Sequence, residues 1–348
     1  MTDHGTTTAS GAAGVRPAAA LARLSVLVAG VALLTSRVML LVHEFGGHAA
    51  PATWFGGRVT GWYLFLFAGG RVSYRLGNLD ASRRLVVSLG GIALELVIGA
   101  GAFALARSMR DRATAAFCQL CVGTVLVGHA AMYLARGVHY GFGDGAFLAQ
   151  RLGGARVFVV VAASTLAVGV AFAGGRLLSR FAAAFFAATT TRRAAGAVLL
   201  VFAAAGLVHG GLASTEVRYF SDATWVRVME DASVVAARDE VARRVAEGKR
   251  RGEQPLSPED QARMTEALER ARRPWPLDPF LVLAVVTGLV VGVVRGTRER
   301  RAMDAASEDG SSILALPSWR FVGGILAALG IVVGIIAMLR PLGASIAP

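Results

Sequence analysis

Apolar segments long enough to cross a membrane recur along the chain and constrain its fold more than any other feature. They are about 18 to 25 residues long, enough for a hydrocarbon core of about 30 Å, and short arginine-containing loops separate them. With 55% hydrophobic and 17% charged residues, the 348-residue chain lacks the composition of a soluble globular protein. The sequence therefore predicts an all-α polytopic membrane protein.

About seven spanning helices are expected. The first covers residues 21–50, after a lead of residues 1–20 that is rich in Ala, Thr and Gly and is expected to be disordered. The other predicted spans cover residues 85–106, 113–135, 157–174, 194–213, 277–294 and 321–339. Residues 181–188 could form an additional interfacial helix.

The strong positive charge fits this class of protein. The formal net charge of +13 lies mostly at the ends of apolar segments, so we expect anionic lipid headgroups, and not nucleic acid, as its counter-charge. We expect a multi-pass protein of a bacterial inner membrane, whose orientation and oligomeric state the sequence leaves open. Cys118 and Cys121 lie inside one apolar segment and are interpreted as small apolar filler.

Two segments outside the spans have distinct patterns. Residues 214–276 contain nearly balanced charges and a capped helix after Ser257, stopped by Pro274, so a helical hairpin outside the bilayer is predicted. Residues 55–75 contain the near-repeat Gly-Gly-Arg-Val-Thr and Gly-Gly-Arg-Val-Ser around an aromatic run. Glycine-bounded runs of β-branched and aromatic residues predict a small membrane-associated β-hairpin.

The strongest functional signal is His43-Glu44 followed by His48 at the end of the first span. Ionisable groups are costly in lipid and mark functional sites when they face the interior of a helix bundle. Neutral imidazoles are zinc ligands, and a neighbouring carboxylate can take a proton from a water whose pKa the ion lowers.

The histidine spacing requires an irregular helix. Residues five apart lie about 140° apart on an ideal α-helix, whereas residues four apart lie about 40° apart, so regular geometry would separate the two rings. Gly46-Gly47 could adopt a π-bulge that absorbs one extra residue. We therefore predict that irregularity here; the alternative is two unrelated polar residues near a helix end.

These residues resemble the site-2 protease family of intramembrane zinc metalloproteases. That family carries His-Glu-x-x-His on a spanning helix, then a membrane-associated β-hairpin, then an Asp-Gly at the start of a later span. Residues 42–50, the predicted hairpin and Gly143-Asp144-Gly145 are similar, and the similar region spans residues 21–174. The resemblance implies that His43, His48 and Asp144 bind zinc and that Glu44 is the general base.

Other polar residues admit more than one interpretation. Asp144 could cap the helix that follows it, and His139 would then be the substitute third ligand. His129 could reach a metal, although a hydrogen bond to a neighbouring helix is favoured for it and for His209. Glu95 needs a partner, and Arg37 is the candidate, either in a buried ion pair or in stabilising charge on a cleaved carbonyl.

The sequence thus predicts a zinc metalloendopeptidase that hydrolyses membrane protein substrates in or near their spans. Val59, Trp62 and Val72 would bind substrate if an extended segment adds to the edge of the hairpin. The rival hypothesis is a non-catalytic membrane protein, either a transporter or an inactive protease homologue, that uses the same histidines and carboxylates to bind metal or protons.

Overall fold

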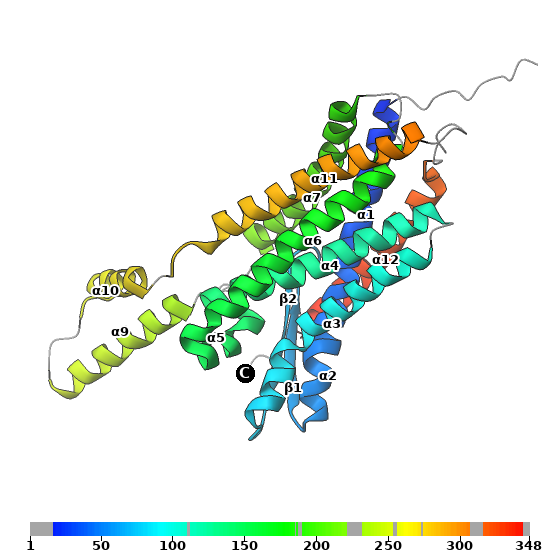
Figure 1. Ribbon diagram of the computed structural model, residues 1–348. Coiled ribbons are helices and arrows are strands. Elements are labelled where there is room, and N and C mark those ends of the chain that lie inside the picture. The colour runs from blue at the N-terminus through cyan, green and yellow to red at the C-terminus, as the bar shows by residue number, and fades with distance from the viewer. Residues whose placement is uncertain are drawn as a thin grey trace, which may run out of the picture.

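Long helices make up most of the protein, as a computed structural model of the chain shows (Figure 1). The structure describes residues 17–109, 112–184, 186, 190–220, 232–252, 256–272, 274–306 and 316–343. Within these residues, 7 helices are long and apolar enough to cross a membrane. The predicted fold class, a polytopic all-α membrane protein with a small antiparallel hairpin, is confirmed.

The spans correspond to those predicted, and each is longer than predicted. They are formed by α1 (Pro17–Leu41) with the π-helix η1 (Val42–Ala49) and α2 (Ala50–Trp54), then α3 (Ala81–Ser108), α4 (Ala113–Tyr140), α6 (Arg156–Ala184), α7 (Thr191–Phe220), α11 (Leu277–Ala306) and α12 (Trp319–Gly343). The short elements η2 (Gly143–Gly145), α5 (Ala146–Leu152) and η3 (Gly153–Ala155) connect α4 to α6.

Two predicted segments need correction. Residues 17–20 belong to α1, and residues 1–16 of the predicted lead lie outside the described residues. Residues 181–184 continue α6 and are not a separate interfacial helix, while most of residues 185–188 lie outside the described part.

Capping and ion pairs explain why the helices run past their apolar segments. The Asp80 carboxylate accepts a hydrogen bond from the Arg83 N–H at 2.8 Å and so starts α3 ahead of its apolar residues. At the end of α11, Arg295 pairs with Glu299 at 3.1 Å, four residues on, and supports a helical turn that hydropathy alone would exclude. Apolar length therefore underestimates these helices.

The predicted hairpin is present. Strands β1 (Arg58–Leu64) and β2 (Gly70–Arg75) are antiparallel, with Val59 opposite Tyr74 and Trp62 opposite Val72. A register shift between Val59 and Gly61 adds local twist. The hairpin lies beside η1 and α2 at one end of the bundle (Figure 1).

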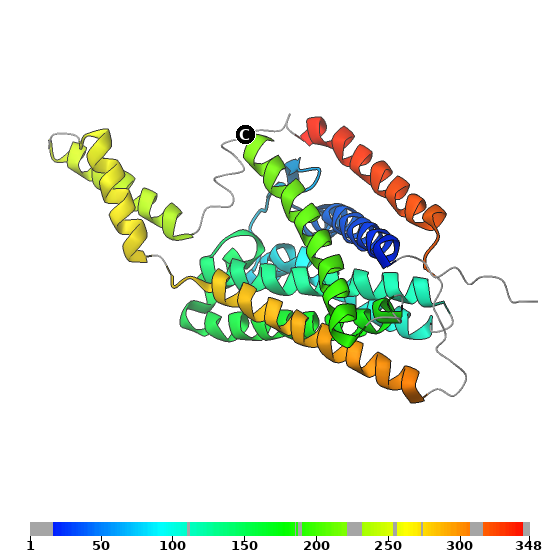
Figure 2. The same ribbon diagram turned by 90° about the horizontal axis from the view of Figure 1, so that it is seen from above.

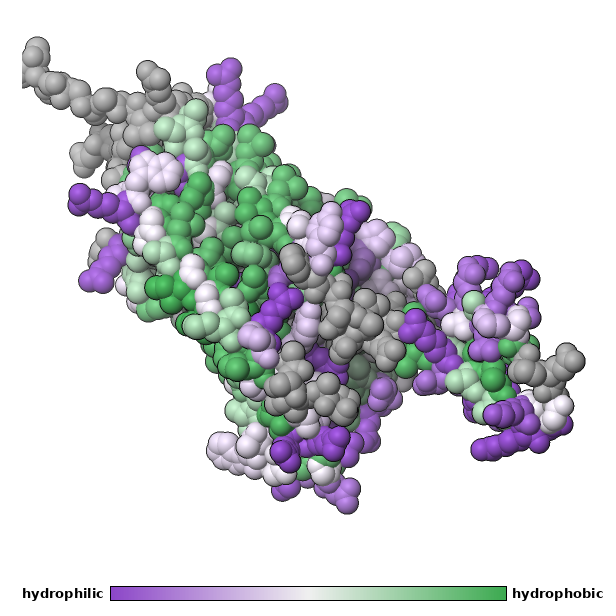
Figure 3. Space-filling model, turned by 180° about the vertical axis from the view of Figure 1, so that it is seen from behind, coloured by the Kyte–Doolittle hydropathy of each residue, from purple (hydrophilic) through white to green (hydrophobic). Residues whose placement is uncertain are grey.

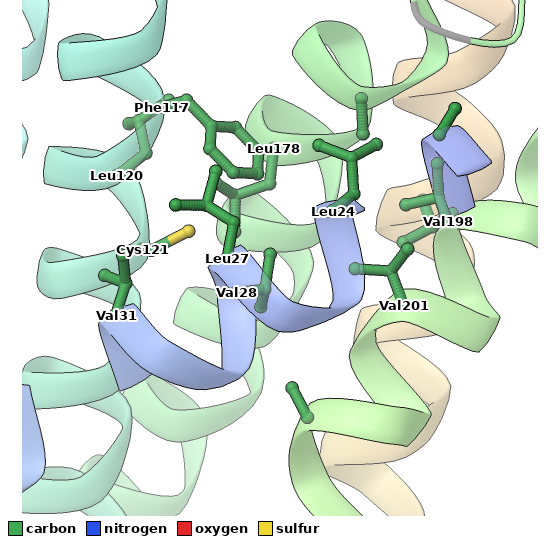
Figure 4. Close-up of a cluster of buried hydrophobic side chains, with 14 of the residues drawn as sticks. Leu24, Leu27, Val28, Val31, Phe117, Leu120, Cys121, Leu178, Val198 and Val201 are labelled. Atoms are coloured by element: carbon green, nitrogen blue, oxygen red, sulfur yellow. The ribbon is translucent and has the colours of Figure 1, made fainter. Parts of the chain in front are cut away.

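The helices form two adjoining groups. α6 lies between α4 and α11 (Figure 1), while α1 contacts α4, α7 and α12. The groups share an apolar core to which α1 contributes Leu24 and Leu27, α4 contributes Phe117, and α7 contributes Val198 (Figure 4). Cys121 is a buried member of this core, so its interpretation as apolar filler is confirmed.

The flanks of the bundle are apolar, as a hydrocarbon environment requires. Large apolar side chains remain exposed on several spans, for example Val97 at 68%, Phe158 at 75% and Ile331 at 66%. The face of the molecule in Figure 3 has a broad hydrophobic surface with hydrophilic residues toward its ends. Soluble monomers rarely expose so continuous a surface, and the protein is therefore a multi-pass membrane protein.

Two polar helices project away from the bundle (Figures 1 and 2). They are α9 (Ala232–Arg250) and α10 (Pro258–Arg272), and the Ser257 hydroxyl caps α10 by accepting the Asp260 N–H at 3.1 Å. This confirms the predicted cap and helical pair. Residues 214–220, which we assigned to this segment, instead complete α7.

Close packing of α6 on α11 generates a stability prediction. A Cβ at Gly292 would overlap the Phe172 carbonyl and leave only 3.0 Å to the Arg176 nitrogen, so two helix backbones meet there. Gly292→Ala should lower the free energy of unfolding by about 1 to 3 kcal/mol because neither backbone can move aside. Thermal unfolding in detergent measures this. Gly330→Ala in α12, where a Cβ meets no atom within 4 Å, is the control and should leave the melting temperature unchanged or slightly raised.

Candidate metal centre

The π-helix η1 brings the two histidines of the motif together. The N–H of Ala50 bonds to the carbonyl of Phe45, five residues earlier, as in a π-helix. Residues five apart then lie above one another, and the ring centroids of His43 and His48 are 4.9 Å apart. The irregularity predicted from Gly46-Gly47 is therefore confirmed.

Contact with α3 supports the unusual turn. A Cβ on Gly47 would overlap the backbone of Gly90 and Gly91, so η1 and α3 meet main chain to main chain. Gly91 also supports the His43 imidazole, because a Cβ at this position would lie 2.5 Å from the ring. Glycine is needed at these positions because any side chain would separate the helices.

Asp144 reaches both histidines from the turn η2. Its Oδ2 lies 3.1 Å from His43 Nε2, and its Oδ1 lies 3.3 Å from His48 Nε2. Gly143, at φ +53°, packs on the Tyr133 hydroxyl, and this contact positions the turn beside α4. The N-cap residues of η2 and α5 are Phe142 and Gly145, and Asp144 lies within η2, so the alternative interpretation of Asp144 as a simple helix cap is wrong.

The outer nitrogens of both imidazoles are engaged by acceptors. His43 Nδ1 lies 2.8 Å from Glu95 Oε1, and His48 Nδ1 lies 2.6 Å from the Val87 carbonyl oxygen. A carbonyl oxygen can only accept, so His48 Nδ1 must carry the proton. If both rings are neutral and carry their proton on Nδ1, the Nε2 atom of each ring has a lone pair that points at the Asp144 carboxylate.

This arrangement of lone pairs against a carboxylate is stable only with a positive charge between or on the groups. One ligand atom from each of His43, His48 and Asp144 lies within 4.8 Å of the others, and the cluster is largely buried. The Asp144 Oδ2 atom is buried and makes no hydrogen bond. A buried carboxylate that faces two imidazole nitrogens and keeps one oxygen unsatisfied is a donor set that a metal ion can satisfy. The residues fit a metal ion.

Glu44 lies beside this donor set without belonging to it. Its side chain is buried, at 5% exposure, and it lies near the main chain of Val72 in β2, the strand that packs on η1. Burial, with the nearby Asp144 and Glu44 carboxylates, raises the pKa of Tyr74 in the same strand to about 12. Tyr74 therefore remains a protonated hydrogen-bond donor at physiological pH.

Glu95 has other partners than those expected. Its two oxygens bridge His43 and His129, each at 2.8 Å. The bond of His129 to α3 confirms the hydrogen-bonded interpretation of that histidine. The pairing of Glu95 with Arg37 is wrong, because the Arg37 guanidinium bonds to the carbonyls of Phe65 and Ala68 in the hairpin turn instead.

His139 is not a substitute ligand in this structure. Its Nε2 lies 2.8 Å from the carbonyl oxygen of Trp275, and the two rings are in edge contact. It therefore connects the end of α4 to the start of α11. Among the described residues, the group that could hold a metal ion consists of His43 and His48 from η1 and Asp144 from η2.

The predicted substrate-binding residues lie on both strands of the hairpin and have different contacts. The Trp62 indole N–H donates to the Leu339 carbonyl at 2.9 Å, so Trp62 attaches β1 to α12. Val72 lies on β2, whose edge faces η1 and Glu44. Val59 is half-buried on β1 opposite Tyr74.

Sequence reasoning missed several residues that shape the site. The Gly90-Gly91 pair within a spanning helix was a readable signal of close helix approach. The Val87 carbonyl and the carboxylate of Glu216, which binds the hairpin turn, carry no sequence signal, because main-chain acceptors and long-range contacts leave no local pattern.

Comparisons with protein-family models, curated proteins and solved structures gave no match for this chain.

The contact of Gly91 with His43 yields a test of the centre. Gly91→Ala should displace the imidazole and weaken metal binding about 10-fold to 100-fold, the range found when the support of a metal ligand is lost. Competition with a chromophoric zinc chelator measures the affinity. Gly101→Ala, on the same helix where a Cβ meets no atom within 4 Å, should retain wild-type affinity. Equal affinities of the two variants would contradict the assigned site.

Proposed function

We propose that this protein is an intramembrane zinc metalloprotease that hydrolyses peptide bonds in or near the spans of membrane protein substrates. The observation that carries the proposal is the convergence of His43, His48 and Asp144 with Glu44 adjacent on the same π-helix. A hydrolytic metal site needs ligands such as two imidazoles and one carboxylate, together with a second carboxylate that does not bind the metal and can accept a proton. Glu44 would be this second carboxylate.

Zinc is the metal that suits these ligands best. Nitrogen-rich sets with one carboxylate favour zinc over calcium or magnesium, which prefer oxygen ligands. Ligand atoms about 2.0 to 2.2 Å from a tetrahedral zinc lie about 3.4 Å from one another. The distances of 3.1 and 3.3 Å from Asp144 to the two histidines are close to that separation.

Glu44 would transfer protons during hydrolysis. A bound zinc ion supplies Lewis acidity, which polarises the scissile carbonyl and acidifies water. Glu44 would take a proton from the attacking water as the new C–O bond forms and deliver it to the amine nitrogen as the C–N bond breaks. Its burial excludes bulk water from this exchange.

The hairpin would present the substrate. A peptide bond within a helix is shielded, whereas an extended segment added to a strand edge exposes its carbonyl groups. The main chain of Val72 already faces Glu44, so a segment along β2 would pass the metal ligands. Trp62 would contribute by attaching the hairpin to α12, and Val59 by supporting the paired strand.

One observation favours the second candidate, a non-catalytic metal or proton carrier. The His129 side chain is 61% exposed and is linked through Glu95 to His43, so polar groups lead from the surface of the bundle to the centre. Intramembrane chains of this kind also occur in ion pathways. Cleavage activity that depends on Glu44 distinguishes the two functions.

The proposal predicts the metal content of the purified protein. Wild type in detergent should contain about one zinc per chain by mass spectrometry, and His43→Ala, His48→Ala and Asp144→Ala should each lose it, because three protein ligands are needed. His139→Ala is the control and should retain zinc, since His139 bonds to Trp275. Zinc that is absent from wild type, or insensitive to the three ligand substitutions, would refute the metal site.

A second prediction concerns the general base. Glu44→Gln should retain zinc and lose about 100-fold to 10,000-fold in kcat, the usual contribution of general acid-base catalysis. The assay is release of fluorescence from self-quenched casein, a generic unfolded substrate, in detergent micelles. Gln261→Glu is the control, because it exchanges the same two side chains in the reverse direction on α10, which projects away from the bundle (Figure 1). It should cleave casein as wild type does. Undiminished cleavage by Glu44→Gln would exclude the proposed role.

A further inference from the structure

A buried carboxylate outside the metal centre binds the turn of the hairpin. Glu216 on α7 is 5% exposed. Its Oε1 accepts the N–H of Leu66 at 2.6 Å, and its Oε2 accepts the N–H groups of Phe67 at 2.6 Å and Ala68 at 3.1 Å. Three successive N–H groups directed at one carboxylate form an anion-binding nest, which the protein fills with its own side chain.

Two arginines from other helices complete this cluster. Arg37 on α1 donates to the Ala68 carbonyl at 2.6 Å. Arg340 on α12 lies 3.6 Å from Glu216 and 5.7 Å from the ring centroids of Tyr63 and Phe65. The turn is therefore bound by side chains from α1, α7 and α12, which satisfy main-chain groups in a largely apolar region.

The turn sets the position of β2 at the metal centre. Gly70, the first residue of β2, packs on α1 so closely that a Cβ would lie 2.8 Å from a Leu40 methyl carbon. Two residues later, the main chain of Val72 lies near Glu44, where β2 packs on η1. A shift of the turn would thus move the strand edge relative to Glu44, with no direct effect on the metal ligands.

The end of α7 has few other contacts that would require a buried carboxylate. A Cβ at Gly206, Gly210 or Gly211 would meet no atom within 4 Å, and Leu207 is 76% exposed. An apolar residue at position 216 would pack this end of the helix at lower desolvation cost, but it would leave three N–H groups unsatisfied. The carboxylate therefore serves the turn.

We propose that Glu216 is a positioning residue for the proposed hydrolysis, because it fixes the hairpin turn so that the edge of β2 aligns an extended substrate with Glu44. The inference rests on the proposed function. Glu216 is not among the residues that could hold the metal ion, and it acts through main-chain bonds to the turn.

The test is Glu216→Gln, which preserves side-chain size but replaces an acceptor of three N–H groups with a neutral amide. Hydrogen exchange of the turn should become about tenfold faster or more, since charge-assisted bonds are lost. KM for quenched casein should rise about tenfold while kcat changes less than about twofold, because alignment is impaired and the chemistry is not. Zinc content should remain about one per chain. Glu216→Asp should recover part of both losses, since it retains the charge.

Glu299→Gln is the matched control. Glu299 is also bound by arginines, Arg176 and Arg180, but it lies on α11 away from the hairpin. It should leave exchange of the turn and KM unchanged. If Glu216→Gln does not fold, Arg340→Gln keeps the three N–H bonds and should give a smaller change in the same direction.

Unchanged exchange or unchanged KM in Glu216→Gln would overturn the proposal, and so would loss of zinc, which would indicate a general structural role. Failure of the proposed function is a separate result, because the wild type itself would then bind zinc without cleaving casein. In that case faster exchange would still support fixation of the turn by Glu216, and unchanged exchange would overturn it.

Discussion

The π-helical turn at Val42–Ala49 is the interaction on which the rest of the site depends. A regular α-helix would direct His43 and His48 to different faces, and no third ligand could join both. The wider turn costs helical stability, and the close contact of Gly47 with Gly90 and Gly91 on α3 offsets this cost. The same contact brings Val87 and Glu95 to the outer nitrogens of the two rings. The packing of η1 on α3 therefore supports the π-helical turn and also orients the two imidazole rings.

The polar groups of the centre compensate one another within an apolar bundle. Glu44, Glu95 and Asp144 would be prohibitively costly in hydrocarbon if isolated. Glu95 is bound by two imidazoles, and Glu44 is buried near the main chain of Val72. Asp144 keeps one buried oxygen, Oδ2, without a hydrogen bond, 3.1 Å from His43 Nε2. This unsatisfied position is compatible with a metal ion bound between the carboxylate and the imidazoles.

Local sequence signals predicted the parts of the structure that local physics determines. Apolar length gave the spans, the repeated Gly-Gly-Arg-Val gave the hairpin, and the glycine pair between His43 and His48 gave the π-helix. Partners of ionisable groups could not be predicted in this way. Arg37 was assigned to Glu95 from its position on the helix face, but it binds a turn 28 to 31 residues away, and Glu216 binds the same turn from about 150 residues away. Such pairings depend on how helices pack, which one sequence does not encode locally.

Helix α1 joins the metal ligands to the hairpin. It carries Arg37, which binds the hairpin turn, and it continues into η1, which carries His43 and Glu44. The residue that binds the hairpin turn and the residues of the site therefore lie on one continuous helix, which sets the distance between them. The remaining contacts of the turn come from α7 and α12, through Glu216 and Arg340. The candidate metal ligands thus depend on contacts with α3 and α4, whereas the position of β2 depends on α7 and α12 together with α1.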